Sequence, residues 1–423
     1  MRVTVVLAVR GAREAALAAA LDGHPDIVVT RRCADLVEAV AALHAGLGAV
    51  ALVSEQPHLD RDALAQLMAS GAVVVGAPSG ADAADHLRAL GLESLVGPEA
   101  DAVEVAAAVL AAADGDAPRA PVPVQQPRVG NDGAVVAVWG PTGAPVRTTL
   151  AVNLSVELAR AGADVVCADA DTYGGAVAHA LGLLDEAPGL AALARASVGG
   201  SLGDDVMERY AVRVAHGLRV LGGITRAERW PELSRAALDP VWDMLRANAD
   251  IVVIDCGFSL ERDEALSYDT HAPQRNAATL SALEAADIVV VVGRAEPLGI
   301  QRLVQAVGEL EESGHAASAR RIVAVNRVRS SVAGPRPERA VADALRRFAG
   351  VEAVWPIPDD PRTCDVAALS GRSLRETRSR SAVVRALAGL AVEIRKAAAV
   401  TSDAEDSPDT LVQPRPVRAG VTD

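Results

Sequence analysis

The chain has 423 residues, half of them hydrophobic, and a formal net charge of −14 at pH 7. This length and apolar content predict a globular protein of about two to three domains, each with its own core. The negative charge argues against a protein that coats nucleic acid, because such binding needs a basic face that neutralises phosphates.

The sequence shows no signal for export and no membrane span. Only seven residues separate Arg2 from Arg10, which is too short for the apolar core of a secretory signal. No run of about eighteen uncharged apolar residues occurs. We therefore expect a cytoplasmic protein. The cysteines are widely separated, so we expect buried small hydrophobic residues and no zinc or redox motif. They are Cys33, Cys167, Cys256 and Cys364.

The first segment, residues 1–114, alternates short β-branched runs with Ala- and Leu-rich stretches of helical pattern. This rhythm predicts five parallel strands with helices on both faces of the sheet. The expected strands lie at residues 3–9, 27–32, 49–54, 72–77 and 93–97.

The order and length of these elements resemble a response-regulator receiver domain. A working receiver has an acidic pair after the first strand, an Asp at the end of the third and a Lys after the fifth. Here these places hold Val9 and Arg10, Ser54 and Glu55, and Gly97 and Pro98. Without the Asp nucleophile and the carboxylates for magnesium, phosphotransfer has no apparatus. We therefore predict a flavodoxin-like pseudo-receiver that serves docking or dimerisation.

Two segments have the composition of unstructured chain. Residues 115–133 carry four prolines and almost no large apolar residue, which predicts a Pro-rich linker that lets the flanking domains move. Residues 399–423 are polar and rich in acids, which predicts a disordered tail. This tail lacks the basic amphipathic pattern of a membrane anchor.

A phosphate-binding turn is predicted where a strand over residues 134–139 leads into a helix that starts near Leu150. The connection, GPTGAPVRTT, contains glycines and ends at the helix N-terminus. Backbone N–H groups and the helix dipole would point at one spot there, which an anion can occupy. We therefore expect a doubly wound, mostly parallel P-loop domain over residues 134–398.

The turn is similar to the deviant Walker A loop of MinD/ParA ATPases, whose pattern is KGGxGKTT. In this register Gly143, Thr148 and Thr149 match the pattern. The resemblance implies that ATP and Mg²⁺ are the cofactors. It also implies that Ala144 belongs to the phosphate loop and that Thr148 donates its hydroxyl oxygen to the metal.

Three residues depart from the Walker pattern. Arg147 replaces the phosphate-binding Lys, and its planar fork can contact phosphates bidentately. Val146 stands where the family has Gly, so we expect the loop to take a different path, because a β-branched residue disfavours positive φ. Thr142 replaces the signature Lys, which removes the positive charge that a partner subunit would place on the transferring phosphate. We therefore expect slow ATP hydrolysis or none.

Acidic residues follow two later strands. Asp169 and Asp171 match the family's switch I aspartates, and Asp255 ends the strand that matches Walker B, followed by Gly257. The resemblance implies that Asp169 lies near magnesium and that Asp171 orients the attacking water. Asp255 would hold the metal through water.

Base recognition is expected further along the chain. Two more core strands are predicted at residues 287–293 and 321–328. The family's Asn in the second of these reads the adenine edge, which corresponds to Asn326. Asp359 and Asp360 lie where the family has a second base-contacting loop.

A receiver-like domain joined to such an ATPase resembles the CpaE/TadZ group, which positions Flp/Tad pilus machinery, and the septum-site-determining proteins that share this plan. The resemblance implies a homodimeric ATP switch that recruits pilus, division or partition partners. It also implies peripheral localisation at the cell pole or septum.

Two alternatives to an ATP switch remain open, and so does the role of three arginines in loops. One alternative is a non-catalytic scaffold with a dead P-loop, and the other is a ParA-like protein with weak DNA binding. Eight arginines would carry the DNA contact: Arg320, Arg321, Arg327, Arg329, Arg336, Arg339, Arg346 and Arg347. The loop residues Arg226, Arg229 and Arg275 either approach the nucleotide or a partner subunit, or are solvated surface charges.

Overall fold

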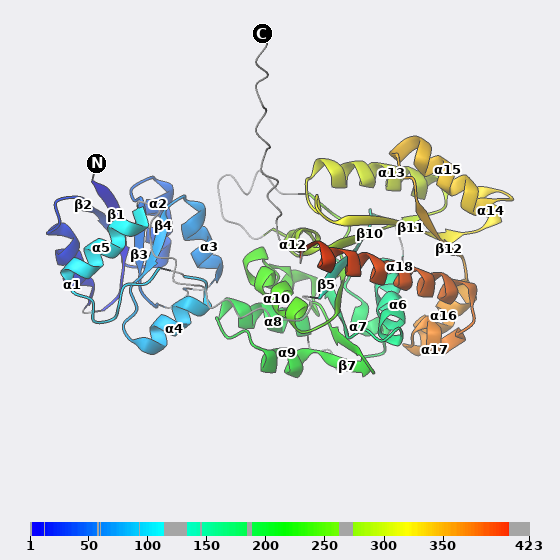
Figure 1. The fold of residues 1–423 in the computed structure, drawn as a ribbon, viewed down its shortest axis with the longest axis horizontal. Helices are drawn as coiled ribbons and strands as arrows, with labels where there is room; N and C mark the ends of the chain where they lie inside the picture. Colours follow the sequence, from blue (N-terminus) through cyan, green and yellow to red (C-terminus); the bar gives the residue numbers. More distant parts are fainter. Residues whose placement is uncertain are drawn as a thin grey trace, which may run out of the picture.

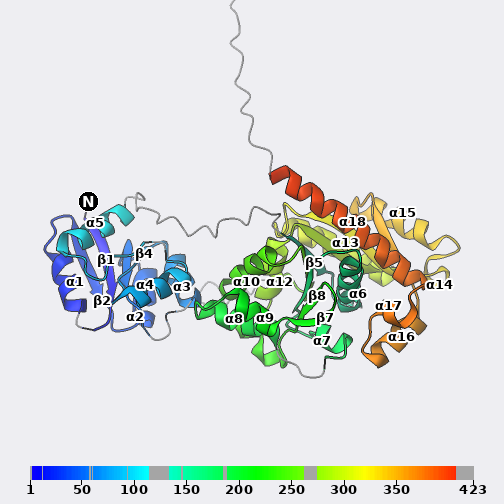
Figure 2. The ribbon, with the colours of Figure 1, turned by 60° about the horizontal axis from the view of Figure 1, so that its bottom comes forward.

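The computed structural model describes residues 2–11, 13–56, 59, 61–92, 94–113, 133–143, 146–183, 188–261 and 274–405. They form two α/β units, each built around its own sheet, which we call the first unit (residues 2–113) and the second unit (residues 133–405) (Figure 1). The predicted linker, residues 115–133, lies outside the described residues except for Gly133. Helix α3 of the first unit lies against α8 and α10 of the second (Figure 2).

The first unit contains a parallel sheet in the order β2-β1-β3-β4, which is part of the flavodoxin-like strand order. The strands are β1 (Val3–Ala8), β2 (Ile27–Arg32), β3 (Val50–Val53) and β4 (Val73–Gly76). The helices are α1 (Arg13–Asp22), α2 (Leu36–His44), α3 (Arg61–Ala69), α4 (Ala81–Ala89) and α5 (Ala102–Ala113). One core packs α2, α3 and α4 on the sheet, and a second packs α1 and α5 on its other face.

The predicted fifth strand at residues 93–97 was wrong in extent. It is reduced to one parallel bridge between Leu95 and Gly76, in which Val96 N donates to Gly76 O at 2.7 Å. Gly97 and Pro98 follow at once, and Pro98 has no N–H with which to continue a ladder.

The second unit contains eight strands in the order β12-β11-β10-β5-β9-β6-β8-β7. All neighbours are parallel except the edge strand β7, which pairs antiparallel with β8, so the prediction of a mostly parallel sheet is confirmed. The strands are β5 (Ala134–Trp139), β6 (Val165–Ala170), β7 (Val212–Ala215), β8 (Leu218–Leu221), β9 (Ile251–Cys256), β10 (Ile288–Arg294), β11 (Arg320–Val328) and β12 (Val354–Pro358).

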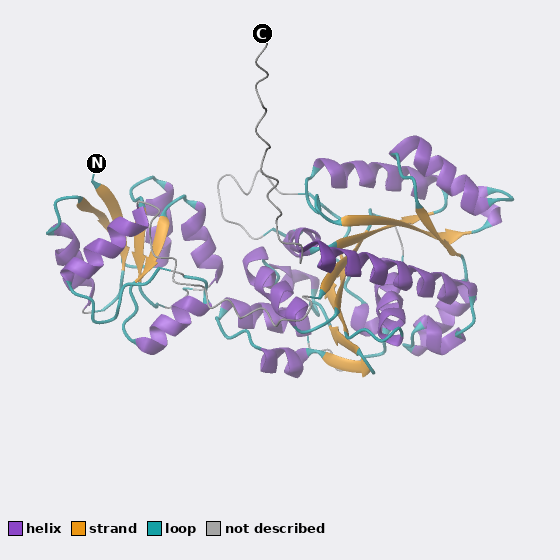
Figure 3. Ribbon diagram, viewed as in Figure 1, coloured by secondary structure: helices purple, strands orange, loops and turns teal. Residues whose placement is uncertain are grey.

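Helices cover both faces of this sheet (Figure 3). The core on one face includes side chains of α6 and α18, and that on the other includes side chains of α8, α10, α12 and α13. The helices are α6 (Arg147–Arg160), α7 (Val177–Ala180), α8 (Gly189–Val198), α9 (Asp204–Tyr210), η1 (Ala227–Glu232), α10 (Arg235–Ala247), α12 (Ala277–Ala285), α13 (Pro297–Glu312), α14 (Ser330–Ala333), α15 (Pro337–Ala349), α16 (Pro361–Ser370), α17 (Leu374–Arg378) and α18 (Ala382–Glu405).

Helix α18 continues to Glu405, past Ala398, where we expected the domain to end. The extra residues include Ala and Glu, which favour helix even where a segment is polar. Residues 406–423, the rest of the predicted tail, lie outside the described residues. Among the helices that are described, none combines the length and apolar character that a membrane span requires.

Candidate nucleotide-binding site

The candidate site lies at the carboxyl edge of the second sheet, where β5 leads into α6. Strand β5 is fully buried between β10 and β9, and the strand order reverses around it. Open α/β sheets bind ligands at such switch points. The connection leaves β5 at Gly140, where a β-carbon would overlap the carbonyl oxygen of Val292, so only glycine fits. Ala144 and Pro145 lie outside the described residues.

Val146 overturns one expectation. Its φ is 92° and its ψ is 10°, so this β-branched residue adopts the left-handed conformation that we expected the loop to avoid. Such a conformation costs on the order of 1–3 kcal/mol for a residue other than glycine. The Val146 carbonyl accepts the Leu150 N–H at 2.8 Å, which begins helix α6. The loop therefore keeps a glycine-like turn with valine in that place.

Arg147 turns its guanidinium inward beneath the loop. Its Nε donates to Cys256 O at 3.2 Å, and its Nη1 donates to Gly140 O at 3.3 Å. Its Nη2 lies 3.5 Å from Asp171 Oδ2. The side chain thus ties the loop to the end of β9 and to the loop after β6, and it places a delocalised positive charge at their junction.

Thr148 and Asp255 form the contact expected of magnesium ligands. Thr148 Oγ1 donates to Asp255 Oδ2 at 2.6 Å, and Asp255 is fully buried. Its Oδ1 has no hydrogen-bond partner among the described residues. Burial, with the nearby charge of Asp169, raises the pKa of Asp255 well above its usual range. A hydroxyl and a carboxylate with a spare buried oxygen fit a hard cation such as Mg²⁺.

The described residues contain no cluster of three or more His, Cys, Asp or Glu side chains that could hold a metal ion. Mg²⁺ commonly binds one or two protein oxygens and completes its shell with water and phosphate oxygens. Thr148 and Asp255 therefore fit a metal that arrives with a nucleotide, and they do not form a complete site on their own.

Asp169 faces its own loop. Its Oδ2 accepts the Val177 N–H at 3.0 Å, and its Oδ1 accepts the Asp171 N–H at 3.2 Å. A β-carbon on Gly175 would lie 2.8 Å from each carboxylate oxygen, so the loop closes tightly around it. Burial raises the pKa of Asp169 to about 7. The described contacts make Asp169 a residue that shapes the loop after β6, and its approach to magnesium stays a prediction.

Asp171 lies between the two loops of the site. Its Oδ1 accepts the Tyr173 N–H at 2.9 Å, and its Oδ2 faces Arg147. A β-carbon on Gly257 would lie 3.4 Å from Asp171 Oδ1, so the loop after β9 closely approaches this carboxylate. The structure therefore brings Asp171, Arg147 and Gly257 together, as the motif order predicts.

The three loop arginines have different surroundings. Arg229 pairs with Glu232, with Nη2 and Oε2 2.9 Å apart, and Arg226 is exposed at the start of η1. Arg275 stacks its guanidinium 4.1 Å from the ring centroid of Tyr173, in the loop that follows Asp171. Arg275 therefore contacts a loop of the site, whereas Arg229 has a surface ion pair.

A cavity of about 550 Å³ opens beside the phosphate loop. This volume lies in the range of small-molecule sites. Its walls include Thr148, Thr149, Asn326, Asp359 and Asp360. The structure thus places the predicted metal-binding threonine and the predicted base-reading residues around one cavity, although they lie far apart in the sequence. The carboxylates Asp169, Asp171 and Asp255 are not part of its wall.

The base-reading candidates differ in what their polar atoms contact. Asn326 is buried, and its Oδ1 accepts the Arg327 N–H at 2.6 Å, while its amide nitrogen has no hydrogen-bond partner within the described chain. Asp359 accepts a hydrogen bond from Arg329 Nη1 at 2.7 Å. Asp360 caps α16 by accepting the Thr363 N–H at 3.2 Å, and it also accepts the Thr363 hydroxyl at 2.7 Å. Asp360 thus has a structural role as the N-cap residue of α16, which was not predicted from the sequence.

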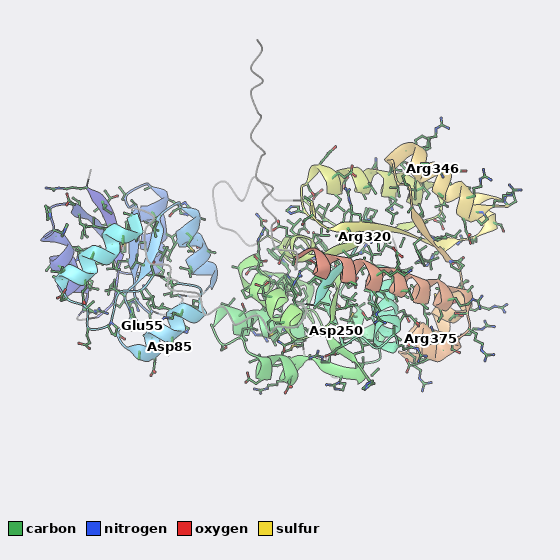
Figure 4. The ribbon with its side chains drawn as sticks, in the orientation of Figure 1. Glu55, Asp85, Asp250, Arg320, Arg346 and Arg375 are labelled. Atoms are coloured by element: carbon green, nitrogen blue, oxygen red, sulfur yellow. The ribbon has the colours of Figure 1, made fainter. Side chains whose placement is uncertain are left out.

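A row of polar side chains on α6 was not predicted from the sequence. Asn153 Nδ2 donates to Thr149 O at 2.8 Å, and Asn153 Oδ1 accepts the Leu374 N–H at 2.7 Å. One turn further, buried Glu157 accepts Arg375 Nε at 2.7 Å, and Figure 4 shows Arg375 on α17 beside α6. The spacing of residues 149, 153 and 157 places them on one helix face, and this pattern was readable in the sequence. The row connects the phosphate loop to α17.

The arginines of the DNA-binding alternative are largely paired with carboxylates. Five of the eight form ion pairs within the described chain: Arg320 with Glu393, Arg321 with Glu311, Arg329 with Asp359, and Arg339 and Arg346 with Asp343. Arg320 and Arg346 also lie on separate elements, β11 and α15 (Figure 4). Such pairing lowers the positive charge that these arginines present to a phosphate backbone.

No protein-family model and no curated protein matches this sequence. Among solved structures, a ParA-family ATPase from Chlorobium tepidum TLS matches with a TM-score of 0.53 and 17% identity, covering 63% of this chain and 100% of that chain. The cell-division ATPase MinD from Pyrococcus furiosus matches with a TM-score of 0.49 and 21% identity, covering 62% and 99%. The first match shows that the chain contains the fold of ParA-family ATPases.

Proposed function

We propose that this protein is a MinD/ParA-type ATP switch whose second unit binds Mg-ATP at the carboxyl edge of its sheet. One observation carries the proposal: a single cavity joins Thr148 and Thr149 of the phosphate loop to Asn326. A nucleotide needs both groups, since its phosphates bind at a helix N-terminus and its base needs a polar edge. The fold shared with a ParA-family ATPase supports the same assignment.

The proposed roles follow the motif. The backbone of Gly143, Ala144 and Thr149 holds the phosphates, and Arg147 contacts them with its guanidinium. Thr148 and Asp255 hold Mg²⁺, with Asp169 behind them, and the metal neutralises phosphate charge when it is bound. Asn326 reads the base, with Asp359 at the edge of the same cavity.

We further propose that hydrolysis is slow. Asp171 would orient a water molecule, whose oxygen would bond to the terminal phosphorus while the bond to ADP breaks. Its carboxylate, however, accepts the Tyr173 N–H and faces Arg147, so it is already engaged. Thr142 also has no charge to lend to the transferring phosphate. The protein then acts through its ATP-bound state and not through turnover.

The cellular role that we propose is the positioning of other machinery, as in the CpaE/TadZ and septum-site groups. ATP would favour a homodimer at the cell pole or septum, and the new surface would recruit pilus, division or partition proteins. The first unit would act as a pseudo-receiver that docks partners. Its strand order and its lack of a phosphoacceptor Asp support this role.

The test is sedimentation of the full chain with Mg-ATP, with Mg-ADP and without nucleotide, together with a phosphate-release assay. We expect a dimer with Mg-ATP, a monomer in the other two samples, and phosphate release of less than about one turnover per minute, below the usual range of enzyme turnover.

Arg147→Ala serves as the variant that should lose the ATP-dependent dimer. If the wild type shows the same sedimentation in all three samples and releases no phosphate, the non-catalytic scaffold becomes the better account. Retention on DNA at low salt that falls steeply as salt is added would favour the partition alternative.

A further inference from the structure

A second guanidinium lies on the outer side of the phosphate loop. Arg302 projects from α13, and its Nη1 donates to Thr142 O at 3.3 Å. A β-carbon on Gly143 would overlap the same Nη1 atom, so the guanidinium lies directly against the first turn of the loop. Arg302 is 160 residues away from Thr142 in the sequence, and no motif points to it.

The rotation of α13 is fixed by its other face. Leu303 is fully buried, and a β-carbon on Gly293 would overlap its side chain, so the helix packs directly on the end of β10. Strand β10 is the neighbour of β5, from which the phosphate loop emerges. The sheet order and this contact therefore hold Arg302 over the loop.

The one hydrogen bond of Arg302 to a described residue, Thr142 O, uses one of the five N–H donors of a guanidinium. Within the described chain it forms no ion pair. Two arginines near the same sheet edge do: Arg294 lies 2.6 Å and Arg329 lies 3.3 Å from Glu296 Oε1.

The loop lacks a positive charge at this place. Thr142 is uncharged, and Arg147 points to the opposite, inner side, where it contacts Cys256 O and Asp171. The loop is thus flanked by an inner guanidinium from its own sequence and an outer one from α13. Phosphate groups bind guanidinium bidentately, and two such groups can contact different phosphates of one chain.

We propose that Arg302 is a phosphate-contacting residue that binds the terminal phosphate of the ATP held by its own chain. This inference rests on the proposed function. ADP has no terminal phosphate to meet Arg302, so the residue should discriminate between the two nucleotides. Arg147, which lies under the loop, should contribute to the binding of both.

The test is calorimetric titration of the full chain with Mg-ATP and with Mg-ADP, for the wild type, Arg302→Ala, Arg302→Lys and Arg302→Gln. We expect Arg302→Ala to weaken Mg-ATP about tenfold and Mg-ADP less than about twofold, as loss of one charge-assisted contact implies. Arg302→Gln should behave like Arg302→Ala, and Arg302→Lys should recover part of the loss. Arg339→Ala, an exposed arginine on α15, is the matched control and should change neither affinity.

Three results would overturn the inference, and they differ in what else they overturn. If Arg302→Ala weakened Mg-ATP and Mg-ADP equally, or if neither Arg302→Ala nor Arg302→Gln weakened Mg-ATP, the role of Arg302 would be wrong. The proposed function would still stand. Absence of binding by the wild type would overturn the proposed function and the role of Arg302 with it. Thermal unfolding of each variant shows whether a loss reflects misfolding, and Arg302→Lys keeps a long side chain and a positive charge against the loop.

Discussion

The carboxyl edges of the two sheets differ, although both sheets are parallel and covered on both faces. At the edge of the first unit, Arg13 donates to the carbonyls of Pro78 and Gly97, and both oxygens of Glu55 accept the Ser79 N–H, at 3.2 and 3.1 Å. Figure 4 shows Glu55 at this edge. At the edge of the second unit, Asp255 Oδ1 has no hydrogen-bond partner among the described residues, and a cavity of about 550 Å³ remains.

This difference shows that topology provides an edge but does not by itself provide a site. In the first unit, charged side chains bond the loops to one another, so these groups are occupied within the protein. In the second unit, the loops leave a buried oxygen and an open space beside Thr148. We therefore expect substitutions at the two edges to have separate effects, on stability in one and on nucleotide binding in the other.

The largest effect should come from Thr148→Val. The variant loses the hydroxyl that contacts Asp255 and that we assign to Mg²⁺, so Mg-ATP affinity should fall more than about 100-fold, as loss of a metal ligand and a charge-assisted contact implies. Thr148→Ser keeps the hydroxyl and should stay within about fivefold of the wild type, a difference of about 1 kcal/mol. Equilibrium titration checks both, and equal affinities for valine and serine would contradict the assignment.

Arg13→Ala should destabilise the first unit by about 1–3 kcal/mol, because two carbonyls lose a charged donor. Arg31→Ala, which removes an exposed pair with Glu38, is the control and should cost less than about 1 kcal/mol. Labelling of buried Cys33 in urea follows the first unit, since burial raises the pKa of its thiol to about 11 and keeps it unreactive until unfolding.

Tryptophan fluorescence separates the two units in the same urea series. All four tryptophans, Trp139, Trp230, Trp242 and Trp355, lie in the second unit. Arg13→Ala should leave the fluorescence transition and Mg-ATP affinity unchanged. A matching fall in nucleotide affinity would show that the two edges are coupled and would break the comparison.

Asn326→Ala should moderately weaken the binding of ligands that carry a base. We expect about tenfold weaker binding of Mg-ATP, in keeping with the loss of one hydrogen bond that leaves a polar edge unpaired. Binding of inorganic tripolyphosphate, which has no base, should not change. Competition titrations measure both ligands, and equal losses would indicate that Asn326 supports the loop and does not read the base.

The smallest effect should be seen at Cys364, which lines the cavity and is half-buried. Burial raises the pKa of its thiol, so labelling at pH 8 should be slow, and Mg-ATP should slow it a few-fold further by filling the cavity. Cys33, in the first unit, should show no nucleotide effect. Mass spectrometry of labelled peptides gives both rates, and unprotected Cys364 would argue against occupation of this cavity.

The core strands were largely predictable because buried parallel strands are continuous apolar runs. Residues 134–139 were predicted as a strand and form β5. The fifth strand of the first unit was overpredicted, because apolar pattern alone did not account for Gly97 and Pro98. The short strands β7 and β8 were missed, since β7 lies largely exposed at the edge and shows no clear apolar run.

The proximity of Thr148, Asp171 and Asp255 was predictable, because each of these residues belongs to a local motif. Val146 was misjudged because intrinsic backbone preference was weighed without the geometry that the start of α6 imposes. The contact of Arg302 with the loop could not be predicted, because it depends on how α13 packs on β10. The N-cap role of Asp360 was missed, although Asp followed by Pro361 is a local signal for the start of a helix.

The most direct test of the central claim is a calorimetric titration of the wild-type full chain with Mg-ATP. We predict saturable binding of one nucleotide per chain, abolished by EDTA and accompanied by a rise in unfolding temperature, because a ligand that binds only the folded state stabilises it. Absence of both heat and stabilisation at millimolar Mg-ATP would contradict the account and show that the cavity beside Thr148 does not bind ATP.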